Sequence, residues 1–179
     1  MRSRSETPEE QFDRLYRATS DDVLAYLVRR SQSREDARDA LAETYAAAWR
    51  KLDSLPEGER ARLWLFGAAR NELRKTASRL RADDNLGATL AGDAHLLWEP
   101  GPEADDGAEA IHEALASLSP LNREIVTLTA WEGLTPREIA VVLGLSANVV
   151  RIRLHRARSD VRTLLKRDQC LEARPAPAA

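Results

Sequence analysis

The chain has 179 residues, of which 43% are apolar and 31% charged, and its formal net charge is −2. This length and composition suit one or two small domains with real cores and exclude a chain that is disordered throughout. A single cysteine, Cys170, excludes an internal disulfide framework, and because neither a signal peptide nor an apolar run near the ~20 residues of a membrane span is evident, we expect a cytoplasmic protein.

Three helices are predicted before residue 52. A capping-box pattern over residues 7–10 begins the first helix, and Ser20 is expected to cap a second. Ser33 then caps a third, in which apolar residues recur at helical spacing over 37–52.

A loop and a basic helix are predicted next. The loop over residues 52–62 contains Pro56 and Gly58 and is longer than usual connections, which favours a functional role. The helix over residues 62–81 combines basic side chains with Trp64, a pattern typical of surfaces that bind unpaired bases. For Trp64 alone, packing in a core is the better interpretation, since large aromatic side chains are mostly buried.

The charge is segregated along the chain. Residues 83–113 contain nine acidic residues and no lysine or arginine, and the composition predicts a flexible acidic linker over 83–107. An N-terminal helical domain over 1–82 precedes this linker, and a C-terminal helix-turn-helix domain over 108–167 follows it. A tail over 168–179 is expected to be disordered. The predicted fold class is therefore all-α, with two small helical domains joined by the linker.

The helix-turn-helix is predicted from residues 134–167. Thr135 and Glu138 form a capping box for its first helix, Gly144 can take the left-handed conformation that ends this helix, and Ser146 can cap the second. A helix start, a helix end and a second helix start within twelve residues form a pattern that is specific for a helix-turn-helix.

The second helix of this motif is strongly basic on one side. Between residues 146 and 167 it has seven lysines and arginines and a single acid, Asp160. Such a helix fits the major groove, where its N-terminal residues read base edges and its arginines contact phosphates or guanines. The alternative is a structural hairpin with a solvated arginine face, but the caps, the turn and the charge together favour DNA binding.

No constellation for catalysis is evident. His95, His112 and His155 have no neighbouring cysteines or spaced acid pairs, and no glycine-rich phosphate loop is present. We therefore expect a protein without enzymatic activity, metal or cofactor.

In order and content, these parts resemble the RNA polymerase sigma factors of the extracytoplasmic-function group. The segment DARDALAETYAAAW (36–49) is similar to the family's polymerase-binding helix, and RLWLFGAARNELRK (62–75) is similar to its promoter-melting helix. Residues 114–158 are similar to the domain that reads the −35 element. Three matches in this order, separated by a linker, are more specific than a helix-turn-helix alone.

The resemblance implies three sets of functional residues. Those that bind core polymerase are Asp36, Arg38, Asp39, Glu43 and Arg50. Those that bind the −10 element, beside a loop over 52–62 that holds a flipped base, are Arg62, Trp64, Arg70, Asn71, Arg74 and Lys75. Those that read the −35 element are Asn148, Val149, Arg151, Ile152, Arg153 and Arg156.

The resemblance also implies partners. They are core RNA polymerase, promoter DNA and an anti-sigma factor, and the acidic linker would thread into the polymerase cleft. Ala42 departs from the family pattern, because a glutamine is common there. Val149 and Ile152 also depart from it, because they stand where small polar residues are usual and where apolar groups can meet thymine methyls.

Two other classes of protein remain open at the level of sequence. A conventional regulator with an N-terminal ligand or dimerisation domain would bind a paired half-site as a dimer, but it leaves the basic helix over 62–81 without a role. A nucleic-acid enzyme is disfavoured by the missing metal and acid-base groups.

Overall fold

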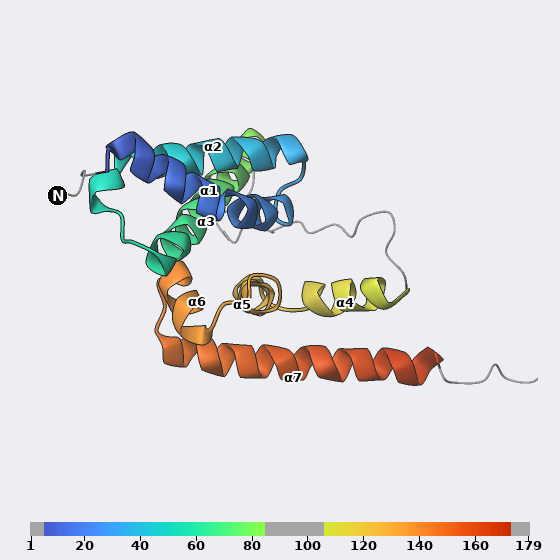
Figure 1. Ribbon diagram of the computed structural model, residues 1–179. Coiled ribbons are helices and arrows are strands. Elements are labelled where there is room, and N and C mark those ends of the chain that lie inside the picture. Colours follow the sequence, from blue (N-terminus) through green and yellow to red (C-terminus); the bar gives the residue numbers. More distant parts are fainter. Residues whose placement is uncertain (1–5, 85–105, 173–179) are drawn as a thin grey trace, which may run out of the picture. The chain divides into compact units, whose positions relative to one another are not determined.

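The computed structural model describes residues 6–84 and 106–172 of the chain (Figure 1). All regular structure in these residues is helical, so the all-α prediction is confirmed for them. They form two compact units, of which the first contains α1 to α3 and the second contains α4, α5, α7 and most of α6. Most of the predicted acidic linker, residues 85–105, lies outside the described residues, as does the tail from residue 173 onward.

The N-terminal unit consists of α1 (Pro8–Val28), α2 (Arg34–Arg50) and α3 (Glu59–Asp84), each in contact with the other two. Its fully buried apolar side chains come from all three helices: Val23, Tyr26, Leu27, Ala37, Ala48, Leu65, Phe66 and Ala69. Burial of each large side chain among these contributes roughly 1.5–3 kcal/mol, which makes this shared core the main support of the unit.

The start of α1 is confirmed as a capping box. The Thr7 hydroxyl accepts from the amide of Glu10 at 3.2 Å, and the Glu10 carboxylate accepts from the amide of Thr7 at 3.0 Å. The predicted break at Ser20 is wrong, because α1 continues through it to Val28. The helical spacing of buried Thr19, Val23 and Leu27 runs across this point, so packing on one continuous stripe outweighs the capping tendency of a serine.

The loop after α2 is shorter than predicted. Residues Leu52–Ser54 form a 3₁₀ turn, labelled η1, and α3 begins at Glu59, so only residues 55–58 are irregular. Gly58 has a φ of 59°, a conformation that favours glycine, directly before the helix. An acid at the first helical position suits the positive end of the helix dipole, which explains why α3 starts three residues earlier than expected.

The C-terminal unit consists of α4 (Asp106–Ala116), α5 (Pro120–Ala130), α6 (Pro136–Leu143) and α7 (Ala147–Glu172). The long helix α7 packs against both α4 and α5, and the three can be followed in Figure 1. The core cluster between them is formed by Leu115, Leu118 and Ala157, with Val126 and Val161 packed against it.

Three helices extend into segments that were predicted to be linker or tail. Helix α3 runs to Asp84 and α4 begins at Asp106, so the helices take two residues from each end of the expected linker. Helix α7 runs to Glu172, five residues beyond the expected end at Arg167. The prediction of disorder is therefore wrong for residues 168–172, where no glycine or proline interrupts the helix.

Candidate nucleic-acid interface and polymerase-binding surface

The first helix of the helix-turn-helix begins and ends as the sequence predicts. The Thr135 hydroxyl accepts from the amide of Glu138 at 3.4 Å, and the amide of Thr135 donates to the Glu138 carboxylate at 2.7 Å. Gly144 ends α6 with φ 67° and ψ 35°, and the next amide, that of Leu145, donates to the carbonyl of Ala140 at 2.9 Å. The left-handed glycine turns the chain so that α7 can start three residues later, at Ala147.

Helix α7 has one packed side. Ser146 precedes the helix, and its hydroxyl accepts from the amide of Val149 at 3.3 Å, which confirms the predicted cap. Val150, Leu154 and Ala157 follow at steps of four and three residues and are buried. These contacts fix which side of α7 points away from the unit.

The opposite side of α7 presents four of the six residues expected to read the −35 element. Asn148, Val149, Ile152 and Arg156 are all exposed and recur at helical spacing on the side away from Val150. Val149 and Ile152 are 38% and 45% exposed, so neither belongs to the buried core. We call these four residues the open face of α7.

The other two residues lie at the flanks of this face. Arg151 is exposed on one flank. Arg153 is partly buried on the other, where its Nη1 donates to Oδ1 of Asn122 in α5 at 3.2 Å. This bond ties Arg153 to the neighbouring helix and brings in Asn122, which the sequence did not reveal because the two residues are 31 positions apart.

The electrostatics of this region favour an anionic partner. No aspartate or glutamate occurs between Ser146 and Ser159, whereas Arg151, Arg153, Arg156 and Arg158 do. A surface with one sign of charge attracts the opposite charge even when the net charge of the chain is near zero. This surface has the charge and the helix geometry of a duplex-binding site.

In the N-terminal unit, the residues expected at the −10 element lie along α3. Asn71, Arg74 and Lys75 are exposed and lie within two turns, and Lys75 also pairs with Glu72, with 2.7 Å between Nζ and Oε1. Trp64 and Arg70 are partly buried.

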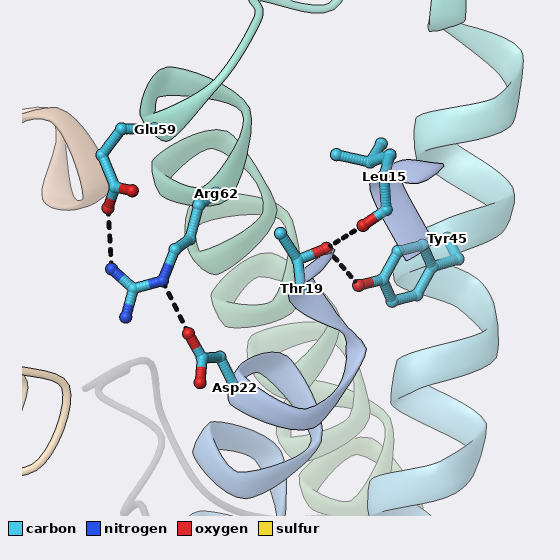
Figure 2. A network of polar contacts seen from close by, with 6 residues as sticks. All are labelled: Leu15, Thr19, Asp22, Tyr45, Glu59 and Arg62. Atoms are coloured by element: carbon cyan, nitrogen blue, oxygen red, sulfur yellow. Dashed lines mark hydrogen bonds and ion pairs between the residues drawn. The ribbon is translucent and has the colours of Figure 1, made fainter. Parts of the chain in front are cut away.

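Arg62, also expected at the −10 element, is held by two carboxylates (Figure 2). Its Nε lies 2.8 Å from Oδ2 of Asp22 in α1, and its Nη1 lies 2.7 Å from Oε1 of Glu59. The guanidinium also lies 5.0 Å from the centre of the Phe66 ring. Burial alone would lower the pKa of Arg62, but the hydrogen bonds and attraction from Glu59 and Asp22 outweigh burial and raise it. Arg62 therefore joins α1 to the first turn of α3.

A second polar contact in Figure 2 joins α1 to α2. The Thr19 hydroxyl donates to the carbonyl of Leu15 at 2.7 Å and lies 2.7 Å from the Tyr45 hydroxyl, which can donate to it. Burial raises the pKa of Tyr45 to about 12. This contact fixes the register of α2, the helix with the expected polymerase-binding residues, against α1.

Four of those five residues share one exposed stripe of α2. Asp36, Asp39, Glu43 and Arg50 follow one another at steps of three, four and seven residues, and all are exposed. Asp36 also completes the start of the helix, since the Ser33 hydroxyl donates to its carboxylate at 2.7 Å and accepts from its amide at 3.0 Å.

Arg38 is exposed on a neighbouring stripe of α2, together with Trp49. Trp49 is 45% exposed, and its ring meets that of Phe12 edge to face at 5.1 Å. Tyr16 and Tyr45 extend this aromatic cluster, with ring centres 4.7 Å apart. The sequence alone did not reveal this aromatic cluster or that it reaches the surface.

Within the described residues, no group of three or more His, Cys, Asp or Glu side chains is placed to hold a metal ion. In the same part of the chain, no helix has the length and apolar character needed to cross a membrane.

Comparison with known proteins decides the family. Residues 15–83 match the model of Sigma-70 region 2, and residues 108–161 match that of Sigma-70, region 4. The RNA polymerase sigma factor CnrH of Cupriavidus metallidurans is 35% identical over 143 residues, which cover 74% of this chain and 75% of that protein. This chain belongs to the RNA polymerase sigma factors of the extracytoplasmic-function group. It is a promoter-recognising transcription initiation factor, and a conventional dimeric regulator is not favoured.

Other similar proteins agree with this assignment. The sigma factor NccH of Alcaligenes xylosoxydans xylosoxydans is 34% identical over 140 residues, with 75% of each chain covered. A structure of CnrH in complex with the cytosolic domain of CnrY is similar in fold, with a TM-score of 0.59, 26% identity and 88% of each chain covered. The sigma factor RpoE in complex with the anti-sigma factor NepR from Bartonella quintana gives a TM-score of 0.65 at 24% identity, with 88% of this chain and 98% of that chain covered.

Proposed function

We propose that this sigma factor divides initiation among three surfaces: α2 binds core polymerase, α3 with the preceding loop engages the −10 element, and α7 reads the −35 duplex. The observation that carries the proposal is the open face of α7. It begins directly after the Ser146 cap, points away from the packed side of the helix, and lies in a stretch of chain without acids. A duplex major groove admits such a helix, and its phosphates attract the flanking arginines.

At the −35 element, the open face would contact base edges, with Arg151 and Arg153 at the flanks contacting phosphates. Arg153 is suited to a fixed position because Asn122 holds it at 3.2 Å. Side chains that are fixed before binding lose less conformational freedom when the complex forms.

At the −10 element, Asn71, Arg74 and Lys75 would contact the opened strand. Their exposure on α3 supports this role, and residues 55–58 are near enough in sequence to the start of α3 to hold a flipped base. Trp64 and Arg70 would border the same site. Arg62 would act on it indirectly, because its ion pairs with Asp22 and Glu59 fix the first turn of α3.

On α2, the stripe formed by Asp36, Asp39, Glu43 and Arg50 would bind core polymerase, with Arg38 on the adjacent stripe. Three carboxylates on one exposed stripe suit a partner surface with basic residues. The acidic segment over 83–107 would enter the polymerase cleft, where a run of carboxylates resembles the charge of RNA.

We further propose that an anti-sigma factor binds this chain, because similar sigma factors form complexes with NepR and with CnrY. The protein would act without enzymatic activity of its own, in the cytoplasm with core polymerase.

The test is transcription by core polymerase with and without the full chain. We expect new start sites only in its presence, with two shared sequence elements upstream. A chain that never associates with core polymerase would refute the proposal, and a stable dimer that binds a palindrome tightly without polymerase would support the regulator class instead.

A further inference from the structure

Val149 and Ile152 form an apolar pair on the open face of α7. They are three residues apart, so their side chains are neighbours on the helix surface, and they are 38% and 45% exposed. Val150, Leu154 and Ala157, by contrast, are buried and pack into the unit. The pair therefore has no part in the core.

We propose that this pair selects thymine: Val149 and Ile152 contact the 5-methyl groups of two thymines in the −35 element. The inference rests on the proposed function of α7 and names the base that these two residues read. In the major groove, the methyl group of thymine is the apolar feature that distinguishes a T·A pair from the other pairs.

The surroundings of the pair indicate DNA rather than an apolar protein partner. Arg151, Arg153 and Arg156 lie around it, and no acid occurs from residue 146 to residue 159. A polyanion is attracted to such a rim, whereas an apolar helix would leave three arginines without counter-charges. The Arg153–Asn122 bond at 3.2 Å holds one side of this rim in place.

The spacing also fits. Side chains three residues apart on a helix are separated by about 5–6 Å at Cβ. Successive base pairs are about 3.4 Å apart along a duplex. The two side chains can therefore meet methyl groups on neighbouring base pairs or on pairs one step further apart.

Discrimination rests on the methyl group itself. A methyl group that leaves water against Val149 or Ile152 gains the free energy of apolar burial. Cytosine has only a hydrogen at the same ring position, so it makes no such contact. The contact therefore favours thymine without a hydrogen bond from the protein.

The experiment uses holoenzyme reconstituted from core polymerase and the full chain. Promoter duplexes with a randomised upstream element are transcribed, and the templates that support transcription define the element. Each thymine in it is then replaced by deoxyuridine, which removes only the methyl group. We expect two positions at which this replacement weakens holoenzyme binding by about fourfold. This is the loss in affinity expected when one buried apolar carbon is removed.

Variants assign the effect to the protein. Ile152→Ala and Val149→Ala should each bind thymine and deoxyuridine equally well at one of the two positions. Both side chains are exposed, so these changes preserve the packing of α7. The matched control is Ile111→Ala, which removes a 47% exposed isoleucine from α4 and should leave both discriminations intact.

The outcomes separate the inference from the proposed function. Promoter-specific transcription with equal binding of thymine and deoxyuridine throughout the element, or with an element that lacks thymine, would overturn the thymine contact alone. An anti-sigma complex that depends on Val149 and Ile152, together with unchanged base discrimination in the variants, would overturn it too. Absence of promoter-specific transcription would instead refute the proposed function.

Discussion

Arg123 lies in the first turn of α5 and reaches back to the end of α4. Its Nε donates to the carbonyl of Leu115 at 2.7 Å, and its Nη2 donates to that of Ala116 at 2.6 Å and to that of Leu118 at 3.4 Å. Carbonyl groups at the end of a helix have no partner within it, and a cation there also suits the helix dipole. Burial lowers the pKa of Arg123 from its ordinary value, a cost that these bonds offset.

We predict that Arg123→Ala lowers the stability of the C-terminal unit by about 2 kcal/mol, because it leaves these carbonyls unpaired. Amide hydrogen exchange of the full chain measures this change, since α4 and α5 should lose protection while α2 in the other unit does not. Arg137→Ala, which removes an exposed arginine from α6, is the control and should change little. Equal loss of protection in both units would contradict a local role for Arg123.

Tyr45 gives a prediction on pH. Its folded-state pKa of about 12 lies above the ordinary tyrosine pKa of 10.0, and the side chain is only 4% exposed. The folded state therefore favours the neutral phenol, whose contribution is fully present below about pH 10 and is lost as pH rises toward about 12. We expect the free energy of unfolding of the N-terminal unit to fall by up to about 2–3 kcal/mol across this window.

Tyr45→Phe separates this effect from other titrations. The variant should be less stable below pH 10, because Thr19 loses its partner at 2.7 Å, but its stability should fall less steeply at high pH. Urea unfolding at several pH values measures both quantities. Parallel pH profiles for the two proteins would show that another group is responsible.

At the scale of elements, the sequence predicts features that depend on neighbouring residues. The capping boxes at Thr7 and Thr135 and the left-handed Gly144 were all predicted, because each depends on residues within about one helical turn. Ser20 was misread for the same reason: its capping tendency is local, whereas the continuity of α1 depends on packing against α2 and α3.

Contacts between elements could not be predicted in this way. Arg62 was assigned to DNA from the resemblance, and Arg153 from the resemblance and from the charge of its helix. Their partners Asp22 and Asn122 are 40 and 31 positions away in sequence. Only the packing of α1 on α3, and of α5 on α7, brings these pairs together. Which residues of α7 form the open face and which form its flanks likewise depends on the side of the helix that packs against the rest of the unit.

The Asp22–Arg62 pair allows a test of how α1 is joined to α3. A double-mutant cycle with Asp22→Ala and Arg62→Ala should give a coupling free energy of about 1 kcal/mol, because the Arg62 side chain is only 22% exposed. Asp13 and Arg17 form a matched pair on α1, with side chains 56% and 78% exposed, and should couple by no more than about 0.5 kcal/mol. Urea unfolding of the four proteins in each cycle provides the values. Equal coupling in the two cycles would mean that the Asp22–Arg62 pair acts as an ordinary surface pair.

At the scale of the whole chain, the near-zero net charge conceals separate surfaces of opposite sign. The exposed stripe of α2 has Asp36, Asp39 and Glu43, whereas α7 has no acid before Asp160. The two helices belong to different compact units. Charge changes on one surface should therefore act on one partner, provided that the units bind polymerase and the −35 duplex separately.

Glu43→Lys and Arg156→Ala test this separation. Glu43→Lys places a cation on the proposed polymerase surface and should weaken core binding at least about tenfold through like-charge repulsion. Asp160→Lys makes the same change of net charge on α7 and should leave core binding unchanged. Fluorescence anisotropy of the labelled full chain with core polymerase, in the absence of DNA, measures core binding by each of the three variants, Glu43→Lys, Asp160→Lys and Arg156→Ala.

Arg156→Ala should have the complementary effect. It removes one cation beside the duplex, so holoenzyme binding to a promoter should weaken and the slope of log K against log salt should fall by about one. Core binding should stay unchanged. In the proposed arrangement, polymerase holds the N-terminal unit on the same promoter. The −35 contact would then act at a raised effective concentration, so modest affinity of α7 would suffice in the holoenzyme. If Arg156→Ala reduced core binding as much as Glu43→Lys does, the two surfaces would not be separate, and the division of work between the units would be wrong.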